Sequence, residues 1–278
     1  MPDWSRCRPS RRRLLAGVGT GVSALAVWGL SPLITSGSVP STRPRIVGHR
    51  GASGLEPPNT AAAIQRAIEL GVDGVELDVR RTRDGTLMLF HDPVLDWDST
   101  GHGWIRNTTW EEIQGARIDG EPLISLARAL ELLADTDVSI YLELKEAGYT
   151  DAILEMAREY DVLDRVTVIS FEAAPLEQAQ TSDVPTGLVG SVPTSGLADE
   201  ATDCGAGSVF SHYVPRAIPR FLETAREAGL TAGVWKLVDT KGSVRDALTI
   251  EPDVFVTNRP DYAFEFLNST PRKGERAV

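Results

Sequence analysis

Short apolar runs alternate with stretches of helical periodicity along the chain from Arg45 onward. Nine of these runs are candidate strands: Arg45–Gly48, Val75–Asp78, Leu87–Phe90, Ser139–Leu144, Val166–Ser170, Thr186–Val189, Ser208–Phe210, Thr231–Trp235 and Val254–Thr257. Each is almost continuously apolar, which is typical of parallel strands buried on both faces. Six candidate helices accompany them: Asn59–Leu70, Thr109–Ala116, Leu126–Ala134, Thr150–Tyr160, Ala174–Thr181 and Pro215–Ala228. Repeated strand–helix units predict an α/β fold, most simply a (β/α)8 barrel.

Two details differ from an ideal barrel. A (β/α)8 barrel has eight strands, but the sequence offers nine candidates, so we expect one of them to be a segment at the barrel rim. Only the eight residues 79–86 separate the second and third strands, which is too few for a crossover helix. Either an extended link returns along the outside of the barrel, or Asp84-Gly85 forms a hairpin turn and the two strands are antiparallel.

The first forty residues differ from the rest of the chain. Five arginines form a basic start, and the uncharged, apolar run Leu14–Leu30 follows them. This order predicts an export signal, and Ser10-Arg11-Arg12-Arg13-Leu14-Leu15 favours the twin-arginine route. The alternative for residues 1–40 is an N-terminal membrane anchor, although 17 residues are few for a stable span. We therefore expect an exported protein.

Residues 41–278 have the size of one α/β barrel domain. The whole chain has a formal net charge of −11, and residues 1–40 hold five arginines and one aspartate, so the remainder carries −15. Such a charge argues against nucleic acid as a partner and against docking on anionic lipid. We expect membrane contact only through the N-terminal segment, if that segment is not cleaved.

Three carboxylates within apolar strands suggest a metal site. Glu76 and Asp78 are two residues apart, so on a strand they share one face. Glu143 repeats this arrangement with Lys145 on a later strand. Buried carboxylates need a cation, and oxygen ligands favour Mg²⁺ or Ca²⁺. For each acid alone, the alternative is a salt bridge to an arginine such as Arg50 or Arg80.

Two histidines follow strands in the same part of the chain. His49 ends the first candidate strand and His91 follows the third. In a barrel, the carboxyl ends of the strands open onto the active-site face, so the two imidazoles can act as base and acid for one reaction. Arg50 has the forked guanidinium that binds phosphate. A cation, two acid/base groups and two positive side chains suit a phosphodiester above all.

The chain resembles the glycerophosphodiester phosphodiesterase family from Arg45 to about Asp261. Several separate blocks in the family's order carry the resemblance: HRGASGLEPPNTAAAIQRAIELGVDGVELDVRRTRDGTLMLFHDP, YLELK, ISF, VWKLV and VTNRPD. Membership implies a distorted (β/α)8 TIM barrel of the PLC-like phosphodiesterase type and a divalent cation, Mg²⁺ or Ca²⁺. It also implies hydrolysis of a small glycerophosphodiester to an alcohol and sn-glycerol 3-phosphate.

The resemblance assigns roles to residues of this chain. The family's catalytic histidines correspond to His49 and His91. Its metal ligands correspond to Glu76, Asp78 and Glu143. Its phosphate contacts correspond to Arg50 and Lys145, and an aromatic residue of its pocket corresponds to Trp235.

The chain also departs from the family pattern at three places. Pro58 replaces the glutamate of the Pro-Glu-Asn-Thr block, Lys236 places a charge at the pocket rim, and Asn258 replaces an aspartate. These changes leave substrate preference open. The alternative functions are lysophospholipase D-type hydrolysis of lysophospholipid headgroups and a noncatalytic exported binding protein.

Overall fold

The computed structural model describes residues 43–235 and 239–269. Eight parallel strands form a barrel that closes where β1 pairs with both β11 and β2. In barrel order these strands are β1 (Arg45–His49), β2 (Gly74–Arg81), β6 (Ser139–Leu144), β7 (Val166–Ser170), β8 (Thr186–Gly190), β9 (Ser208–His212), β10 (Thr231–Trp235) and β11 (Val254–Thr257). The predicted distorted (β/α)8 barrel is therefore confirmed.

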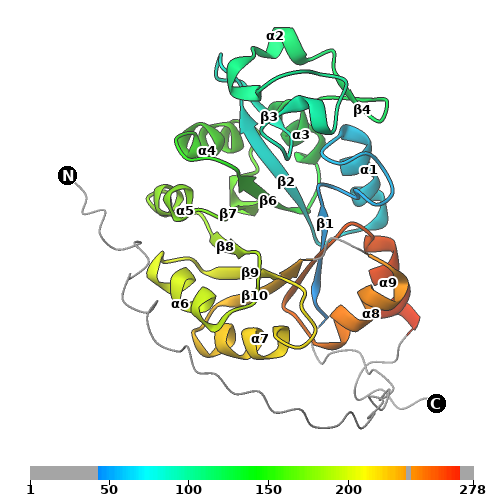
Figure 1. Cartoon of the computed structure of the whole chain (residues 1–278), viewed down its shortest axis with the longest axis vertical. Coiled ribbons are helices and arrows are strands. Elements are labelled where there is room, and N and C mark those ends of the chain that lie inside the picture. Colours follow the sequence, from blue (N-terminus) through cyan, green and yellow to red (C-terminus); the bar gives the residue numbers. More distant parts are fainter. Residues whose placement is uncertain (1–42, 236–238, 270–278) are drawn as a thin grey trace, which may run out of the picture.

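One helix follows each barrel strand, and together they surround the barrel (Figure 1). These helices are α1 (Ala61–Leu70), α3 (Leu126–Leu133), α4 (Thr150–Glu159), α5 (Ala173–Gln180), α6 (Ser195–Asp203), α7 (Ile218–Glu227), α8 (Lys241–Thr249) and α9 (Pro260–Ser269). The first begins two residues later than the sequence predicts, because Asn59 has a left-handed backbone (φ 59°) and Thr60 caps the helix by accepting from the Ala63 amide. The sequence pattern does not predict α6, α8 and α9.

The third candidate strand is the extra one. It forms β3 (Leu87–Leu89), which pairs antiparallel with the last three residues of β2. The hairpin alternative is thus confirmed, and the extended link is wrong. Asp84 stabilises the turn by accepting from the hydroxyl and amide groups of three neighbours, Thr82, Thr86 and Trp110.

An excursion of the chain between β3 and α3 lies beside the barrel (Figure 1). It contains α2 (Trp110–Ile113), the two-stranded sheet of β4 (Arg117–Ile118) and β5 (Glu121–Pro122), and two 3-10 turns, Leu95–Trp97 and Ile105–Asn107. A small apolar cluster that includes Phe90, Leu95 and Ile105 fills its interior. A third 3-10 turn, Leu163–Arg165, precedes β7.

Strand residues divide between two cores. On β2, Val75, Leu77 and Val79 point outward into the large apolar layer beneath the helices. Glu76 and Asp78 alternate with them and face the barrel interior, as the two-residue spacing predicts. The outer face of this strand is therefore apolar, and its inner face carries carboxylates of the site.

The predicted signal segment, residues 1–40, and the Lys236 charge lie outside the described residues. Within residues 43–235 and 239–269, no helix has the length and apolar character needed to cross a bilayer.

Candidate active site

A cavity of about 260 Å³ opens where the barrel strands end. Its polar half comes from β1, β2, β6 and the segment after β3: His49, Arg50, Glu76, His91, Glu143 and Lys145. Its apolar half comes from β7 to β11: Ile169, Phe171, Val189, Phe210, Trp235 and Val256. Of the predicted site residues, only Asp78 does not line the cavity surface, and it lies directly beneath it at 0% exposure. A larger open crevice of about 490 Å³, where β7 and β8 begin, contains no histidine.

The three predicted carboxylates converge. Oxygen atoms of Glu76, Asp78 and Glu143 lie within 4.8 Å of one another, and all three side chains are buried. Parallel pairing of β2 with β6 places Asp78 opposite Glu143 and thereby creates the cluster. Within the described residues, this is the one group of histidine, cysteine and acidic side chains with metal-binding geometry.

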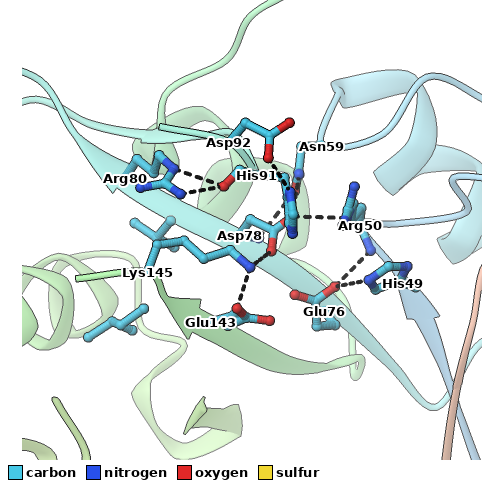
Figure 2. Close-up of polar contacts among 12 residues, drawn as sticks. His49, Arg50, Asn59, Glu76, Asp78, Arg80, His91, Asp92, Glu143 and Lys145 are labelled. Carbon is cyan, nitrogen blue, oxygen red and sulfur yellow. Dashed lines mark hydrogen bonds and ion pairs between the residues drawn. The ribbon is translucent and has the colours of Figure 1, made fainter. Parts of the chain in front are cut away.

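Two positive side chains balance part of this charge. Lys145 bridges Asp78, at 2.7 Å from Nζ to Oδ1, and Glu143 (Figure 2). Arg50 Nε lies 3.0 Å from the other oxygen of Asp78. Burial by itself would raise the pKa of Asp78, but these two cations hold it below its usual range. The predicted salt-bridge alternative is therefore realised for Asp78 with Arg50, whereas Arg80 pairs with Glu146 instead.

Glu76 is the carboxylate that these cations do not satisfy. Its Oε2 accepts from the Arg50 backbone amide at 2.9 Å, but its Oε1 is buried without a hydrogen-bond partner. Burial and the neighbouring Asp78 and Glu143 raise its pKa well above the usual value. A buried acceptor in this state needs a positive partner. The carboxylate cluster therefore fits a divalent cation, which prefers such oxygen ligands.

His49 lies between the carboxylates and β11. Its Nδ1 is 2.6 Å from Asn258 Oδ1, and its Nε2 is 3.8 Å from Glu76 Oε2. An amide oxygen only accepts, so this contact places the proton on Nδ1 and leaves Nε2 as a proton acceptor. Burial, reinforced by the charge of Arg50, lowers the pKa of His49 to about 4.

His91 has a different environment. Its side chain is 40% exposed, and its Nδ1 is 2.9 Å from Asp92 Oδ1 (Figure 2). Burial lowers its pKa, while the negative charge of Asp78 and the contact with Asp92 oppose that shift. A carboxylate partner stabilises the imidazolium form, so His91 is better suited than His49 to donate a proton.

Two aromatic side chains form the outer part of the apolar half. Phe171, which is 45% exposed, meets Trp235 edge to face with 6.3 Å between ring centroids. The indole N–H of Trp235 donates to the Gly190 carbonyl at 3.2 Å, which fixes the ring. The predicted aromatic residue, Trp235, thus lies at the cavity, together with Phe171, which was not predicted.

Three residues that orient the predicted groups were not predicted from the sequence. Asn59 donates to Asp78 Oδ2 at 2.8 Å and accepts from the Asp78 amide. Asn258 and Asp92 each contact one histidine. Asn59 and Asn258 lie inside the blocks that carry the family resemblance and Asp92 follows His91 directly, so their positions were available as a signal.

Known proteins resemble this chain in sequence and in fold. The sequence profile of the glycerophosphoryl diester phosphodiesterase family matches residues 49–262. A glycerophosphodiester phosphodiesterase from Caldanaerobacter subterraneus subsp. tengcongensis is 31% identical over 245 residues, which cover 82% of this chain and 98% of that relative.

Two solved structures share the fold. A glycerophosphodiester phosphodiesterase from Agrobacterium tumefaciens superposes with a TM-score of 0.68 at 26% identity, covering 79% of this chain and 98% of that one. An Oleispira antarctica phosphodiesterase in complex with the product sn-glycerol-3-phosphate gives 0.71 at 21% identity, with 81% and 97% covered. With the profile match and the relative that aligns over nearly its whole length, these findings show that the chain belongs to the glycerophosphoryl diester phosphodiesterase family.

Proposed function

We propose that this protein is a metal-dependent hydrolase that cleaves glycerophosphodiesters to an alcohol and sn-glycerol 3-phosphate. The observation that carries the proposal is the cluster of three buried carboxylates beside two positive side chains, in which Glu76 Oε1 is buried without a hydrogen-bond partner. A divalent cation would satisfy that oxygen, and the two positive side chains suit the negative charge of a phosphodiester. The product bound in the Oleispira antarctica structure is consistent with this substrate class.

Glu76, Asp78 and Glu143 would hold the cation, either Mg²⁺ or Ca²⁺. When bound, it supplies Lewis acidity that withdraws negative charge from the phosphate. Arg50 and Lys145 line the same half of the cavity and add positive charge for the phosphate oxygens. Asn59 keeps Asp78 oriented through its two hydrogen bonds.

Each histidine carries out one of the two proton transfers. His49 Nε2 removes the proton from the attacking hydroxyl, which belongs either to water or to the 2-hydroxyl of the glycerol. In the second case a cyclic phosphate forms, and water then opens it to sn-glycerol 3-phosphate. His91 donates a proton to the oxygen of the leaving alcohol. The neutral partner of His49 and the carboxylate partner of His91 support this assignment.

The experiment that tests the proposal is hydrolysis of glycerophosphocholine by the wild type, with and without EDTA, followed by addition of Mg²⁺ or Ca²⁺. We expect EDTA to abolish turnover and one of the two metals to restore it. His49→Ala and His91→Ala should each lose a factor of about 10² to 10⁴ in kcat while keeping the wild-type circular dichroism spectrum. Full turnover in EDTA would contradict the metal requirement, and a near-normal rate in either variant would contradict the proton transfers.

A second candidate activity is lysophospholipase D-type cleavage of lysophospholipids. The apolar half of the cavity and the half-exposed Phe171 at its mouth favour it, because an acyl chain could lie along them. A faster rate on lysophosphatidylcholine than on glycerophosphocholine would establish this preference. Binding of both compounds without turnover would instead favour a noncatalytic exported binding protein.

A further inference from the structure

We infer that Arg80 is a positioning residue for His91, acting through the His91 backbone. This inference rests on the proposed function, in which His91 donates a proton. Arg80 is not among the residues that line the cavity, so it contacts no substrate there. Nothing in the family resemblance assigns it a role at the site.

His91 depends on such support because it does not belong to a barrel strand. It lies two residues beyond the end of β3, where the chain leaves the barrel for the excursion. The preceding amide, that of Phe90, donates to the Asp78 carbonyl at 3.0 Å, and this is the last backbone contact that joins the segment to β2. Asp92 orients the imidazole ring, but Asp92 belongs to the same loop. Beyond His91, the Ile105 amide donates to the Pro93 carbonyl, which ties the loop to the excursion and leaves its link to the barrel to side chains.

Arg80 supplies that connection. It lies on β2 two residues after Asp78, and its side chain is only 9% exposed. Its Nε and Nη2 both donate to the His91 carbonyl oxygen, at 2.9 and 2.6 Å (Figure 2). Its Nη1 donates to Glu146 Oε1 at 2.8 Å. The planar guanidinium is thus held at both ends, by the His91 loop and by the residue that follows Lys145.

The consequence is that one buried side chain sets the distance between His91 and the polar half of the cavity. Two hydrogen bonds to one carbonyl restrict both the position and the tilt of that peptide. A lysine carries the same charge but lacks the rigid fork. Because a displacement of about 1 Å in a catalytic group can reduce turnover by about 100-fold, loss of the fork should lower kcat more than it weakens substrate binding.

Arg81 provides a matched control. It is the next residue of β2, it also donates to a backbone carbonyl, that of Gly148 at 2.9 Å, and its guanidinium covers the Tyr149 ring. It therefore joins β2 to the segment after β6, as Arg80 does through Glu146, without touching His91. Arg81 is exposed and Arg80 is buried, so Arg81→Ala tests the loss of that link, and Arg80→Lys, which keeps the buried charge, tests the loss of the fork.

The experiment compares Arg80→Ala and Arg80→Lys with Arg81→Ala on glycerophosphocholine, with kcat normalised to folded protein. We expect Arg80→Ala to lose about 10- to 100-fold in kcat with KM little changed, Arg80→Lys to lose less, and Arg81→Ala to retain wild-type kinetics. Added guanidinium ion should partly restore Arg80→Ala. If Arg80→Ala does not fold, Arg80→Lys, which retains the buried charge, decides the question.

A second readout does not depend on activity. The imidazole resonances of His91, identified by their absence in His91→Ala, should be sharp and single in the wild type. They should be broadened or doubled in Arg80→Ala and in Arg80→Lys, and unchanged in Arg81→Ala. Wild-type kcat in a folded Arg80 variant, or unchanged His91 resonances, would overturn the inference while leaving the proposed function intact. A wild type that hydrolyses no substrate would overturn the proposed function, and the resonances alone would then decide whether Arg80 positions His91.

Discussion

The two histidines of the cavity differ in the group that each contacts through Nδ1. His49 contacts the neutral amide of Asn258, whereas His91 contacts the carboxylate of Asp92. Asn258 is itself fixed, because its backbone amide donates to Asp239 Oδ2 at 2.6 Å and its Oδ1 also accepts from Ser53 Oγ. A neutral partner gives little stabilisation to an imidazolium, which leaves burial to dominate the pKa of His49.

This difference predicts the pH dependence of turnover. The pKa of His49 is lowered to about 4, so His49 stays an unprotonated base until the pH falls to that value. The acidic limb that His49 contributes to kcat/KM should therefore lie well below that of an exposed histidine. Asn258→Asp places a carboxylate beside His49, favours the imidazolium and should move the limb to higher pH by about one unit or more.

The measurement is kcat/KM for glycerophosphocholine as a function of pH. Asn268→Asp is the control, because it adds the same charge at an exposed position near the end of α9. Its acidic limb should coincide with that of the wild type. An unshifted limb in Asn258→Asp would show that His49 does not set it.

At the scale of elements, the apolar half of the cavity depends on how β8, β9 and β10 pack inside the barrel. Phe210 on β9 is 2% exposed and meets Tyr141 edge to face. A Cβ atom at Gly187 would lie 2.7 Å from the Phe210 ring, and one at Gly233 would lie 2.1 Å from it. The missing side chains on the two flanking strands therefore create the space for this ring.

Gly233→Ala should consequently lower the free energy of unfolding by about 1–3 kcal/mol, because the added methyl group overpacks the barrel interior. Gly207→Ala is the matched control, since a Cβ there has open space and the residue directly precedes β9. Denaturant unfolding of both variants measures the difference. Equal stability of Gly233→Ala and the wild type would mean that Phe210 moves aside without cost.

The elements also show where sequence patterns succeed and fail. The strands were predictable because burial on both faces requires apolar runs, and the Asp84-Gly85 turn allowed for the hairpin. The missed helix α8 is polar over most of its length and contains Gly242. It is held by its Thr240 cap and by packing of Val244, Ala247 and Leu248 against the core. This packing exists only in the folded barrel, so the local sequence does not indicate it.

At the scale of the whole molecule, the N-terminal segment and the rest of the chain carry net charges of opposite sign. Residues 41–278 carry −15, whereas residues 1–40 carry five arginines and one aspartate. The family profile and the described barrel both lie within residues 43–269. We therefore retain the proposal that residues 1–40 direct export by the twin-arginine route or anchor the protein, and that the barrel is the functional domain.

The export proposal predicts that residues 1–40 carry a fused reporter across the cytoplasmic membrane. Replacement of Arg11 and Arg12 by lysine should block transport and leave the precursor in the cell, because the twin-arginine route requires that pair. Replacement of Arg6 and Arg8 by lysine is the control and should not block transport. Immunoblots of cell fractions measure the distribution. Unimpaired export of the Arg11/Arg12 variant would exclude this route.

The sequence by itself determined the order of the barrel strands and of six helices, α1 to α5 and α7, because each barrel strand has a buried apolar face that a helix must cover. It also indicated His49, His91, Glu76, Asp78 and Glu143 as candidate site residues, because ionisable groups at the ends of buried strands are costly unless a cation or hydrogen bonds compensate them. The tertiary structure decided their partners. Asn258 reaches His49 from 209 residues away, and Arg80 holds the His91 loop through a backbone carbonyl. Such contacts depend on barrel closure and strand register. These bring together residues that are far apart in the chain, and the sequence around one residue does not indicate its partner.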